Sequence, residues 1–289
     1  MNRARMLIVG RRGFVGSTLA MAAAQQFEVV EDHGPEGPPI DITSAESVRA
    51  VFDSARPDIV VLAAAISDID RCENSPDRAA RVNVAGAIHV ARECARHGAR
   101  LIFTSSGAVF DGTREEYRES DPVTPISVYG RTKAEAESAL ADILPSTAVL
   151  RLSLVLGYAP TNQSNSLLNK LRDTFTKGTR VRASTLEQRN AIDIGTLNQF
   201  ILKLAAMPDV AGVFHVGSDQ ALSRYEITCA LAQKMGFAPA LVEAETIPAP
   251  GRAPRGLRHH LIADKISAAC GITIPTSDAV FERCLHAIT

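Results

Sequence analysis

The sequence predicts an α/β protein with a doubly wound parallel sheet, and two observations support this. Over the first half of the chain, short runs rich in β-branched residues alternate with longer amphipathic or alanine-rich segments. This is the pattern of buried parallel strands joined by crossover helices. In addition, a glycine-rich turn follows the first of these runs and opens the first helix-like segment, as in Rossmann folds that bind dinucleotides.

Each expected strand in this half is short and apolar. The strands are expected at 6–10, 27–30, 58–65, 100–106 and 147–157. Helices are expected between them, at 15–26, 44–55, 77–98 and 127–143. We therefore assign residues 1–156 to a Rossmann domain that binds a dinucleotide.

The alternation is looser in the second half. A helix is expected near 166–177, a second at 192–207 with Asp193 as its acidic N-cap, and a buried strand at 212–217. The remaining tail, with a Pro/Gly-rich stretch at 247–256 and two short helical stretches, predicts a small irregular lobe. The chain is thus expected to return to the Rossmann domain at about 191–217, while 157–190 and 218–289 form a smaller substrate-binding lobe.

Bulk composition excludes several classes of function. The chain has 289 residues and a formal net charge of −1, so no overall field would draw it to nucleic acid or to an anionic membrane. Its longest uninterrupted apolar run, 59–66, is far shorter than a membrane span, and we expect a cytoplasmic protein. The five cysteines form no C-x-x-C pair and have no histidine at metal-ligand spacing, so we expect reduced thiols and no metal.

The glycine-rich turn is the first candidate site. Glycines at 10, 13 and 16 let the backbone approach a diphosphate, which the amides at the start of the following helix would bind. An ordinary tight turn is the alternative. The cofactor contacts expected in this segment are Gly10, Arg11, Arg12, Gly13, Phe14, Val15 and Gly16.

The second strand ends in acidic residues that bear on the choice of cofactor. Glu31 or Asp32 could bond the adenosine ribose, which favours NAD. Arg11 and Arg12 could instead pair with a 2′-phosphate, so NADP(H) is preferred and NAD(H) is the alternative. Further cofactor contacts are expected from Asp41 and Ile42, beside the adenine, and from the small side chains of Ala63, Ala64 and Ala65.

Tyr129 and Lys133 lie four residues apart on a predicted helix and so share a face. The ammonium is expected to lower the pKa of the phenol, which could then exchange a proton with a carbonyl oxygen while a hydride moves. Ser105 and Ser106 end the fourth strand, at the sheet edge where such folds bind ligands. A hydroxyl there could orient the carbonyl.

These residues resemble the extended short-chain dehydrogenase/reductase superfamily, and within it the dTDP-4-dehydrorhamnose reductase branch. The matching segments are VGRRGFVG, DIT, PDIVVLAAAISDIDRCENSP, RVNVAG, SSGAVFDGT, PISVYGRTKAEAE, LRLSLVLG and GVFHVG. The resemblance implies that Ser106 orients the carbonyl, that Tyr129 is the acid/base, and that Lys133 tunes it and binds the nicotinamide ribose. It also implies that Asn83, in RVNVAG, packs beside the cofactor.

The chain departs from that branch on the sugar side. The family's Ser/Thr-Asp-Tyr is here Ser106, Gly107 and Ala108, and its tryptophan after LRxS is Leu154. Dehydratases of similar sequence need an Asp-Glu pair at these positions, and GDP-fucose synthases need a further cysteine and histidine, so neither activity is expected. A 4-epimerase needs no more than Ser106, Tyr129 and Lys133 and remains an alternative.

Basic residues of the second half are candidates for the substrate's phosphates. The resemblance nominates Arg189, in EQRNAIDI, as the residue near a diphosphate. The stretch 251–260 adds Arg252, Arg255, Arg258, His259 and His260, for which a solvated basic loop is the alternative. The predicted substrate contacts are Ser106, Gly107, Arg189, Arg252 and Arg258.

The sequence thus predicts an NAD(P)-dependent reductase that acts on a keto group of a nucleotide-linked (deoxy)sugar, with Tyr129 as proton donor. One alternative is an NAD-dependent 4-epimerase. The other is a non-catalytic NADP-binding subunit, as in the regulatory subunit of methionine adenosyltransferase, which this branch resembles. The expected partner is a small molecule, and the resemblance also allows a homodimer.

Overall fold

A sheet of six parallel strands forms the centre of the computed structural model, which describes residues 3–33, 38–160, 166–247 and 251–286. Every pair of neighbouring strands is parallel. In spatial order the strands are β10 (Gly212–Val216), β5 (Ala148–Leu152), β4 (Arg100–Ser106), β3 (Ile59–Leu62), β1 (Arg5–Val9) and β2 (Glu28–Val30). This confirms the predicted α/β class, and the order reverses between β1 and β3, where ligands bind in such sheets.

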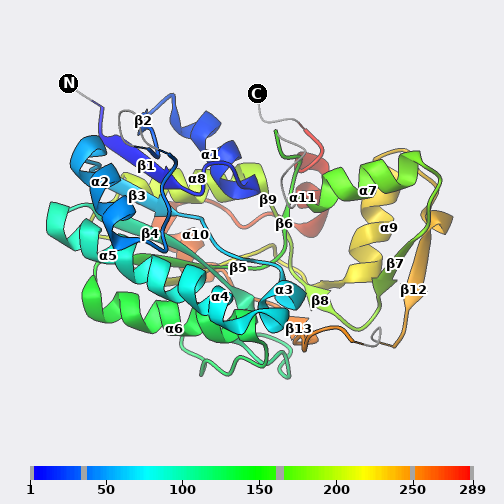
Figure 1. Cartoon of the computed structure of the whole chain (residues 1–289). Helices are drawn as coiled ribbons and strands as arrows, with labels where there is room; N and C mark the ends of the chain where they lie inside the picture. Colours follow the sequence, from blue (N-terminus) through cyan, green and yellow to red (C-terminus); the bar gives the residue numbers. More distant parts are fainter. Residues whose placement is uncertain (1–2, 34–37, 161–165, 248–250, 287–289) are drawn as a thin grey trace.

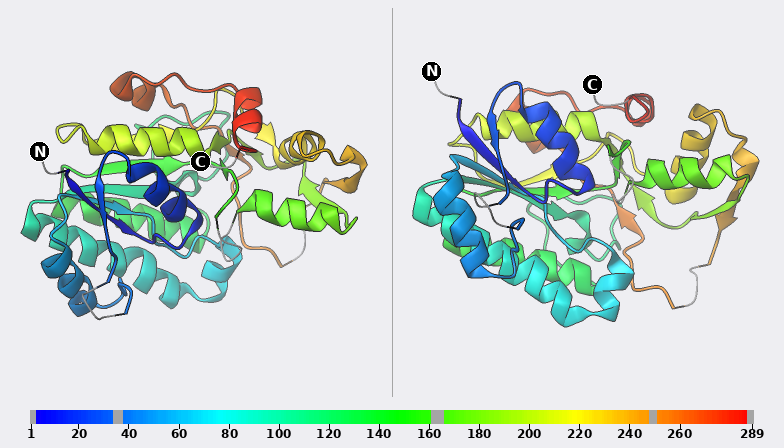
Figure 2. Two further views of the ribbon diagram at one scale, coloured as in Figure 1. Left: turned by 90° about the horizontal axis from the view of Figure 1, so that it is seen from above. Right: turned by 45° about the horizontal axis from the view of Figure 1, so that its top comes forward.

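Helices cover both faces of the sheet (Figures 1 and 2). One face is covered by α1 (Phe14–Ala23), α8 (Ile194–Ala205) and α10 (Asp264–Cys270), and the other by α2 (Ala45–Ala55), α5 (Gly86–His97) and α6 (Val128–Ile143). Successive side chains of a strand point to opposite faces. Met6 and Ile8 of β1 therefore enter one core while Leu7 and Val9 enter the other, which is why this strand is apolar throughout.

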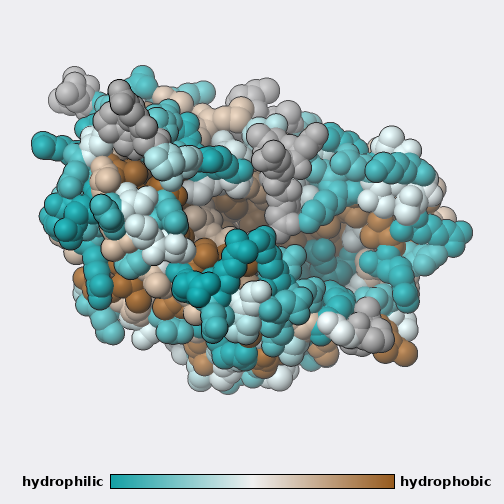
Figure 3. Space-filling model, viewed as in Figure 1, coloured by the Kyte–Doolittle hydropathy of each residue, from teal (hydrophilic) through white to brown (hydrophobic). Residues whose placement is uncertain are grey.

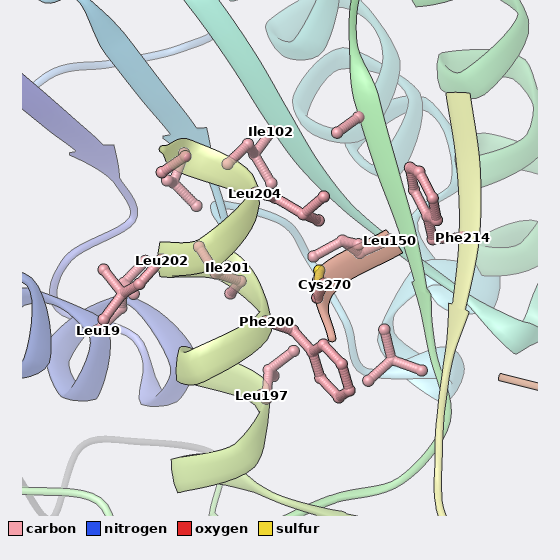
Figure 4. Packing of buried hydrophobic residues seen from close by; sticks show 14 of the residues in the cluster. Leu19, Ile102, Leu150, Leu197, Phe200, Ile201, Leu202, Leu204, Phe214 and Cys270 are labelled. Atoms are coloured by element: carbon pink, nitrogen blue, oxygen red, sulfur yellow. The ribbon is translucent and has the colours of Figure 1, made fainter. Parts of the chain in front are cut away.

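The core under α8 holds the first and last strands of the domain together. Leu197 and Ile201 of α8 lie over the sheet beside Leu150 of β5 and Phe214 of β10 (Figure 4). Asp193 caps this helix by accepting a hydrogen bond from the amide of Thr196 at 2.8 Å, as the sequence predicted.

Two predicted elements differ from the structure. The run 147–157 is not one strand: β5 ends at Leu152, and β6 (Val155–Leu156) pairs with β9 (Ile192–Asp193) outside the central sheet. The predicted helix 77–98 is α4 (Pro76–Ala80), a π-helical turn η1 (Arg81–Ala85) and α5 in succession. A π turn widens a helix locally and often marks a functional site, and here it contains Asn83.

The smaller lobe has its own core and is less irregular than predicted (Figure 1, right). It consists of α7 (Leu167–Thr176), α9 (Arg224–Lys234), α11 (Ser277–Arg283) and the parallel pair β7 (Val181–Ser184) and β12 (Val242–Glu245). Helix α9 was not predicted at a specific position, although Ser223 and Glu226 form a capping box at its start.

The strands β11 (Leu222–Ser223), β8 (Gln188–Arg189) and β13 (Arg258–His259) form a small separate sheet. The remaining short helices are α3 (Ile69–Asn74), η2 (Gly107–Val109) and η3 (Pro239–Leu241). Helix α10 lies within 218–289 but packs against α8 and β10, so this part of the range contacts the sheet domain. The division into two lobes at the predicted boundaries stays a prediction. Among the described residues, no helix is both long and apolar enough to cross a membrane.

Candidate active site

A cleft of about 690 Å³ opens between the carboxyl ends of the sheet strands and the smaller lobe. Figure 3 shows this face of the molecule hollowed in the same region. Its lining includes many predicted site residues, namely Gly13, Phe14, Val15, Gly16, Ala63, Ala65, Ser106, Gly107, Tyr129, Lys133, Arg189 and Arg252. The cleft therefore brings together the glycine loop, the hydroxyl, phenol and ammonium groups, and arginines from the smaller lobe.

The turn between β1 and α1 is packed too closely against the backbone for side chains at Gly10 and Gly16. Gly10 has a φ of +97°, and a Cβ there would lie 2.6 Å from the amide nitrogen of Ala64. A Cβ at Gly16 would lie 2.2 Å from the carbonyl oxygen of Gly10. No side chain caps the first turn of α1, and Phe14, Val15 and Gly16 of that turn line the cleft. The loop thus fits the diphosphate of a dinucleotide, whose charge the helix start would favour.

The two arginines of this loop have acidic neighbours at the end of β2. Arg11 is paired with Glu31. Arg12 is 66% exposed and lies 4.0 Å from the carboxylate of the buried Asp32. Arg12 is therefore the freer of the two to meet a 2′-phosphate, while Asp32 is placed to accept a ribose hydroxyl.

Other predicted cofactor contacts serve as supports behind the cleft. The carboxylate of Asp41 accepts hydrogen bonds from the amide and hydroxyl of Thr43. Ile42 is buried in the core under α2 and α5, and its carbonyl bonds the ring of His89 at 2.9 Å. These contacts shape the loop between β2 and α2, and neither residue lines the cleft.

Asn83 joins three elements through its side-chain amide. Its Oδ1 accepts from the amide of Ile66 at 2.8 Å, and its Nδ2 donates to the Ile66 carbonyl and to the Thr132 hydroxyl, both at 3.0 Å. The π turn thus ties the loop after β3 to helix α6. Asn83 thus fixes the loop that follows Ala63, Ala64 and Ala65. Its bonds act on the cofactor side of the cleft through this loop.

The hydroxyl of Ser106 lies close enough to the phenol of Tyr129 to lower the pKa of that phenol. Ser106 ends β4, and its Oγ accepts from the amide of Ala108 at 3.2 Å. Tyr129 lies in the first turn of α6, where the side chain of Ser127 caps the helix. Lys133 is 2% exposed, and its Nζ lies 4.2 Å from the centroid of the Phe103 ring. All three line the cleft.

Burial dominates the electrostatics of this trio. It raises the pKa of Tyr129 to about 12, against the lowering effect of Ser106. The expected net lowering of the Tyr129 pKa is therefore wrong, because desolvation of the phenolate outweighs the effect of its neighbours. Burial also lowers the pKa of Lys133 to about 8, while Glu137 and Cys72 raise it.

The residues that replace the family's sugar contacts make the cleft wall apolar. Gly107 is buried, and a Cβ there would lie 3.2 Å from a methyl carbon of Leu261. Leu261 itself is fully buried. Ala108 and Leu154 also line the cleft, so these three positions present no polar side chain to a ligand.

Arginines of the smaller lobe line the far end of the cleft, and most have protein partners. Arg189 donates to the carbonyls of Gln188, Leu257 and Gly256, and burial lowers its pKa to about 10. Arg252 pairs with Glu187 and Glu245, both at 3.3 Å. Arg255 donates two hydrogen bonds to Asp70 of α3 across the cleft, and so holds the pKa of Asp70 at about 2.

Arg224 is the cleft arginine that sequence reasoning missed. It is half-buried at the start of α9, where a cation opposes the helix dipole. Within the described part of the chain, its guanidinium has no hydrogen bond and no ion pair. The sequence did contain a signal for this residue, because Arg224 directly follows Ser223, the serine that caps α9.

The remaining basic residues of 251–260 point to different places. Arg258 and His260 line a separate depression with Gln188 and Asp219, so the structure does not bring Arg258 to the cleft. His259 lines the cleft but is buried, and its ring nitrogen lies 3.3 Å from the carbonyl of Phe110. Burial lowers its pKa to about 3.

Comparison with known proteins agrees with this geometry. The family model described as the RmlD substrate binding domain matches residues 4–289. The chain belongs to this family. The match confirms the resemblance to the dTDP-4-dehydrorhamnose reductase branch of the extended short-chain dehydrogenases/reductases.

Proteins of similar sequence include a reductase and a subunit of methionine adenosyltransferase. The chain is 29% identical over 241 residues to methionine adenosyltransferase 2 subunit beta of Bos taurus, covering 79% of this chain and 71% of that protein. It is 29% identical over 279 residues to dTDP-4-dehydrorhamnose reductase of Aggregatibacter actinomycetemcomitans, covering 93% and 94%. A crystal structure of dTDP-4-dehydrorhamnose reductase from Bacillus anthracis in complex with NADP shares the fold, with a TM-score of 0.86, 22% identity and coverage of 98% and 99%.

Proposed function

We propose that this protein is an NADPH-dependent reductase that converts a keto group of a nucleotide-linked sugar into an alcohol, with Tyr129 as the proton donor. The observation that carries the proposal is one cleft that contains residues of the glycine loop, the trio Ser106, Tyr129 and Lys133, and Arg224, whose guanidinium has no hydrogen bond or ion pair among the described residues. Membership of the RmlD substrate binding domain family supports it, as does the similarity to a dTDP-4-dehydrorhamnose reductase along almost the whole chain.

The residues of the trio suit the proton side of a carbonyl reduction. The bound nicotinamide supplies the hydride. The hydroxyls of Ser106 and Tyr129 line the same part of the cleft, and both are suited to hydrogen-bond one carbonyl oxygen. Because burial raises the pKa of Tyr129 to about 12, the phenol stays protonated near neutral pH and is ready to donate. An alkoxide is a stronger base than a phenolate, so the transfer is favourable.

NADP(H) is the proposed cofactor, with NAD(H) as the alternative. Arg12, largely exposed beside the glycine loop, supports the phosphorylated form. A related structure from Bacillus anthracis contains NADP. Asp32, at the end of β2, is the feature that leaves room for NAD(H).

The substrate's anionic end is proposed to lie at Arg224. Arg189 and Arg252, nominated from the sequence, already bond carbonyls and carboxylates of the protein. Arg224 lies in the same cleft and forms no such bond among the described residues. A guanidinium in this setting pairs well with phosphate oxygens.

Absorbance of NADPH tests the proposal directly. The protein is mixed with NADPH and a panel of dTDP-, UDP- and GDP-linked keto-sugars, with Tyr129→Phe in parallel. We expect turnover with at least one sugar, and a loss of about 10²- to 10⁴-fold in kcat for Tyr129→Phe with little change in NADPH affinity. Turnover that persists in Tyr129→Phe would contradict the proposed acid.

A non-catalytic role as an NADP-binding subunit is the second candidate. The similarity to methionine adenosyltransferase 2 subunit beta favours it, and so do Gly107 and Ala108, which replace the family's sugar contacts. Tight NADPH binding without turnover of any sugar in the panel would select this role. Bound NAD, with sugar interconversion in the absence of added cofactor, would instead select the 4-epimerase. A homodimer and a cytoplasmic location remain predictions from the sequence.

A further inference from the structure

A buried ion pair lies directly behind the trio. Glu137 and Arg151 have side chains that are 8% and 5% exposed, and Arg151 Nη2 donates to Glu137 Oε2 at 2.7 Å. Arg151 Nε donates to both carboxylate oxygens, at 3.2 and 3.1 Å. The hydroxyl of Ser105 donates to Glu137 Oε1. The carboxylate of Glu137 is thus bonded from two strands of the sheet.

These bonds connect the two elements that carry the trio. Ser105 precedes Ser106 on β4, and Ser105 pairs in register with Arg151 of β5. Glu137 follows Lys133 by one helical turn and Tyr129 by two on α6, so all three share a face. The position of α6 along β4, and with it the position of Tyr129 relative to Ser106, is therefore fixed at Glu137.

Stability alone does not account for such a pair. Removing two charges from water is costly, and well-packed apolar residues often replace a buried ion pair with no loss of stability. Here the carboxylate also lies one turn from a buried ammonium. Its negative charge favours the charged form of Lys133, which an apolar side chain would not do.

We propose that Glu137 is a positioning residue for the reaction, holding α6 in register with β4 and keeping Lys133 charged, so that this ammonium can bind the nicotinamide ribose. This inference rests on the proposed function. The inference concerns whether Lys133 is protonated, and the pH dependence of NADPH binding reports this without any sugar substrate.

The surroundings of Lys133 make Glu137 its main charged neighbour. Burial lowers the pKa of Lys133 to about 8, and Glu137 is the first of the groups that raise it, ahead of the thiol of Cys72 on α3. Tyr129 faces it from its own helix, and Arg151 faces Glu137 from β5. Among the other charged residues on the elements packed against α6, Glu73 of α3 accepts a hydrogen bond from the amide of Val128, at the start of α6, at 3.0 Å. Asp70 is paired with Arg255, Glu93 with Arg96, and Arg100 of β4 donates to the carbonyls of Leu204 and Pro208. The rest are exposed, namely Arg71, Asp77, Arg78, Arg81, Arg92 and Arg96.

The test is the affinity for NADPH, followed by the fluorescence of the nicotinamide, as a function of pH from 6 to 9.5. For the wild type we expect the affinity to fall as Lys133 loses its proton near pH 8, and Lys133→Met should abolish this fall. In Glu137→Gln the fall should move to lower pH by about one unit. Glu93→Gln is the matched control, because it removes a buried, arginine-paired carboxylate from α5 and should leave the midpoint unchanged.

Glu137→Gln leaves Arg151 buried without its partner, which can prevent folding. The double variant Glu137→Gln/Arg151→Gln removes both charges and should show the same shift, with thermal unfolding measured alongside. Curves that superimpose on the wild type, or a wild-type affinity that is constant across the pH range, would overturn the proposal. Failure of the wild type to bind NADPH at any pH would count against the proposed function instead.

Discussion

At the scale of single residues, the partners of a side chain decide which of several similar residues can bind a ligand. Four arginines line one end of the cleft, namely Arg189, Arg224, Arg252 and Arg255. Three of them bond carbonyls or carboxylates of the protein. Arg224 has no such partner among the described residues, and its place at the start of a helix is unfavourable for a cation. An anionic ligand would offset both costs.

Arg224→Gln is therefore expected to raise the KM for the nucleotide-linked sugar about ten- to a hundredfold, since a hydrogen bond to a charged group contributes about 1.5–3 kcal/mol. The affinity for NADPH should not change. The measurement is steady-state kinetics by NADPH absorbance. Arg180→Gln is the control, because that arginine is 67% exposed and pairs with Glu243 on the surface. Equal KM values for the two variants would exclude Arg224 as the anion ligand.

At the scale of elements, the loop between β1 and α1 combines two different requirements for glycine. Gly16 allows the helix to pack against the turn, because a Cβ there would lie 2.2 Å from a backbone oxygen. Gly13 has an extended backbone that alanine can adopt, with φ of −76°, and a Cβ would lie no closer than 3.3 Å to its neighbours. Gly13 lines the cleft, so its lack of a side chain leaves space for the ligand.

Alanine substitutions at Gly16 and Gly13 are expected to differ in their effect on stability, although both weaken NADPH binding. Gly16→Ala should lower the free energy of unfolding by about 1–3 kcal/mol through overpacking and weaken NADPH binding. Gly13→Ala should unfold near the wild-type midpoint and still bind NADPH poorly, because its methyl group occupies the cleft. Urea denaturation and NADPH fluorescence measure the two quantities. Normal NADPH affinity in Gly13→Ala would argue against this loop as the cofactor site.

At the scale of the whole molecule, buried histidines make the fold sensitive to acid. Burial lowers the pKa of His215 on β10 and of His259 on β13 to about 3. The unfolded chain takes up these protons near pH 6.5, whereas the folded protein does not until about pH 3. The stabilisation is therefore complete above pH 6.5 and is lost as the pH falls towards 3. Asp70 and Asp111 have pKa values lowered from 3.8 to about 2, so their stabilisation is lost as the pH falls from about 4 to about 2.

The free energy of unfolding should accordingly decrease below pH 6.5 by up to about 1.4 kcal/mol per pH unit for each buried histidine. Urea midpoints at pH 7.5, 6.0 and 5.0 measure this dependence. In His215→Gln, which can keep the hydrogen bond to the Tyr117 carbonyl, the dependence should be about half as steep. A slope equal to that of the wild type would show that other groups cause the acid sensitivity.

The sequence by itself predicted the alternation of central strands and helices along the chain, and it singled out the glycine loop and the trio. Their signals are local: apolar runs with both faces buried, turn glycines, and a tyrosine and lysine one helical turn apart. It did not separate β5 from β6, because the break at Ser153 depends on a hydrogen bond to the Val216 carbonyl from a strand far along the chain.

Only the tertiary structure decided how the charged residues are used. Burial, which no local pattern reports, raises the pKa of Tyr129 where the neighbouring lysine alone predicts the opposite. Partners distant in sequence occupy Arg189 and Arg252 and direct Arg258 away from the cleft. The same long-range packing leaves Arg224 unpaired among the described residues and places Glu137 behind the trio, since desolvation and pairing depend on what the fold brings together.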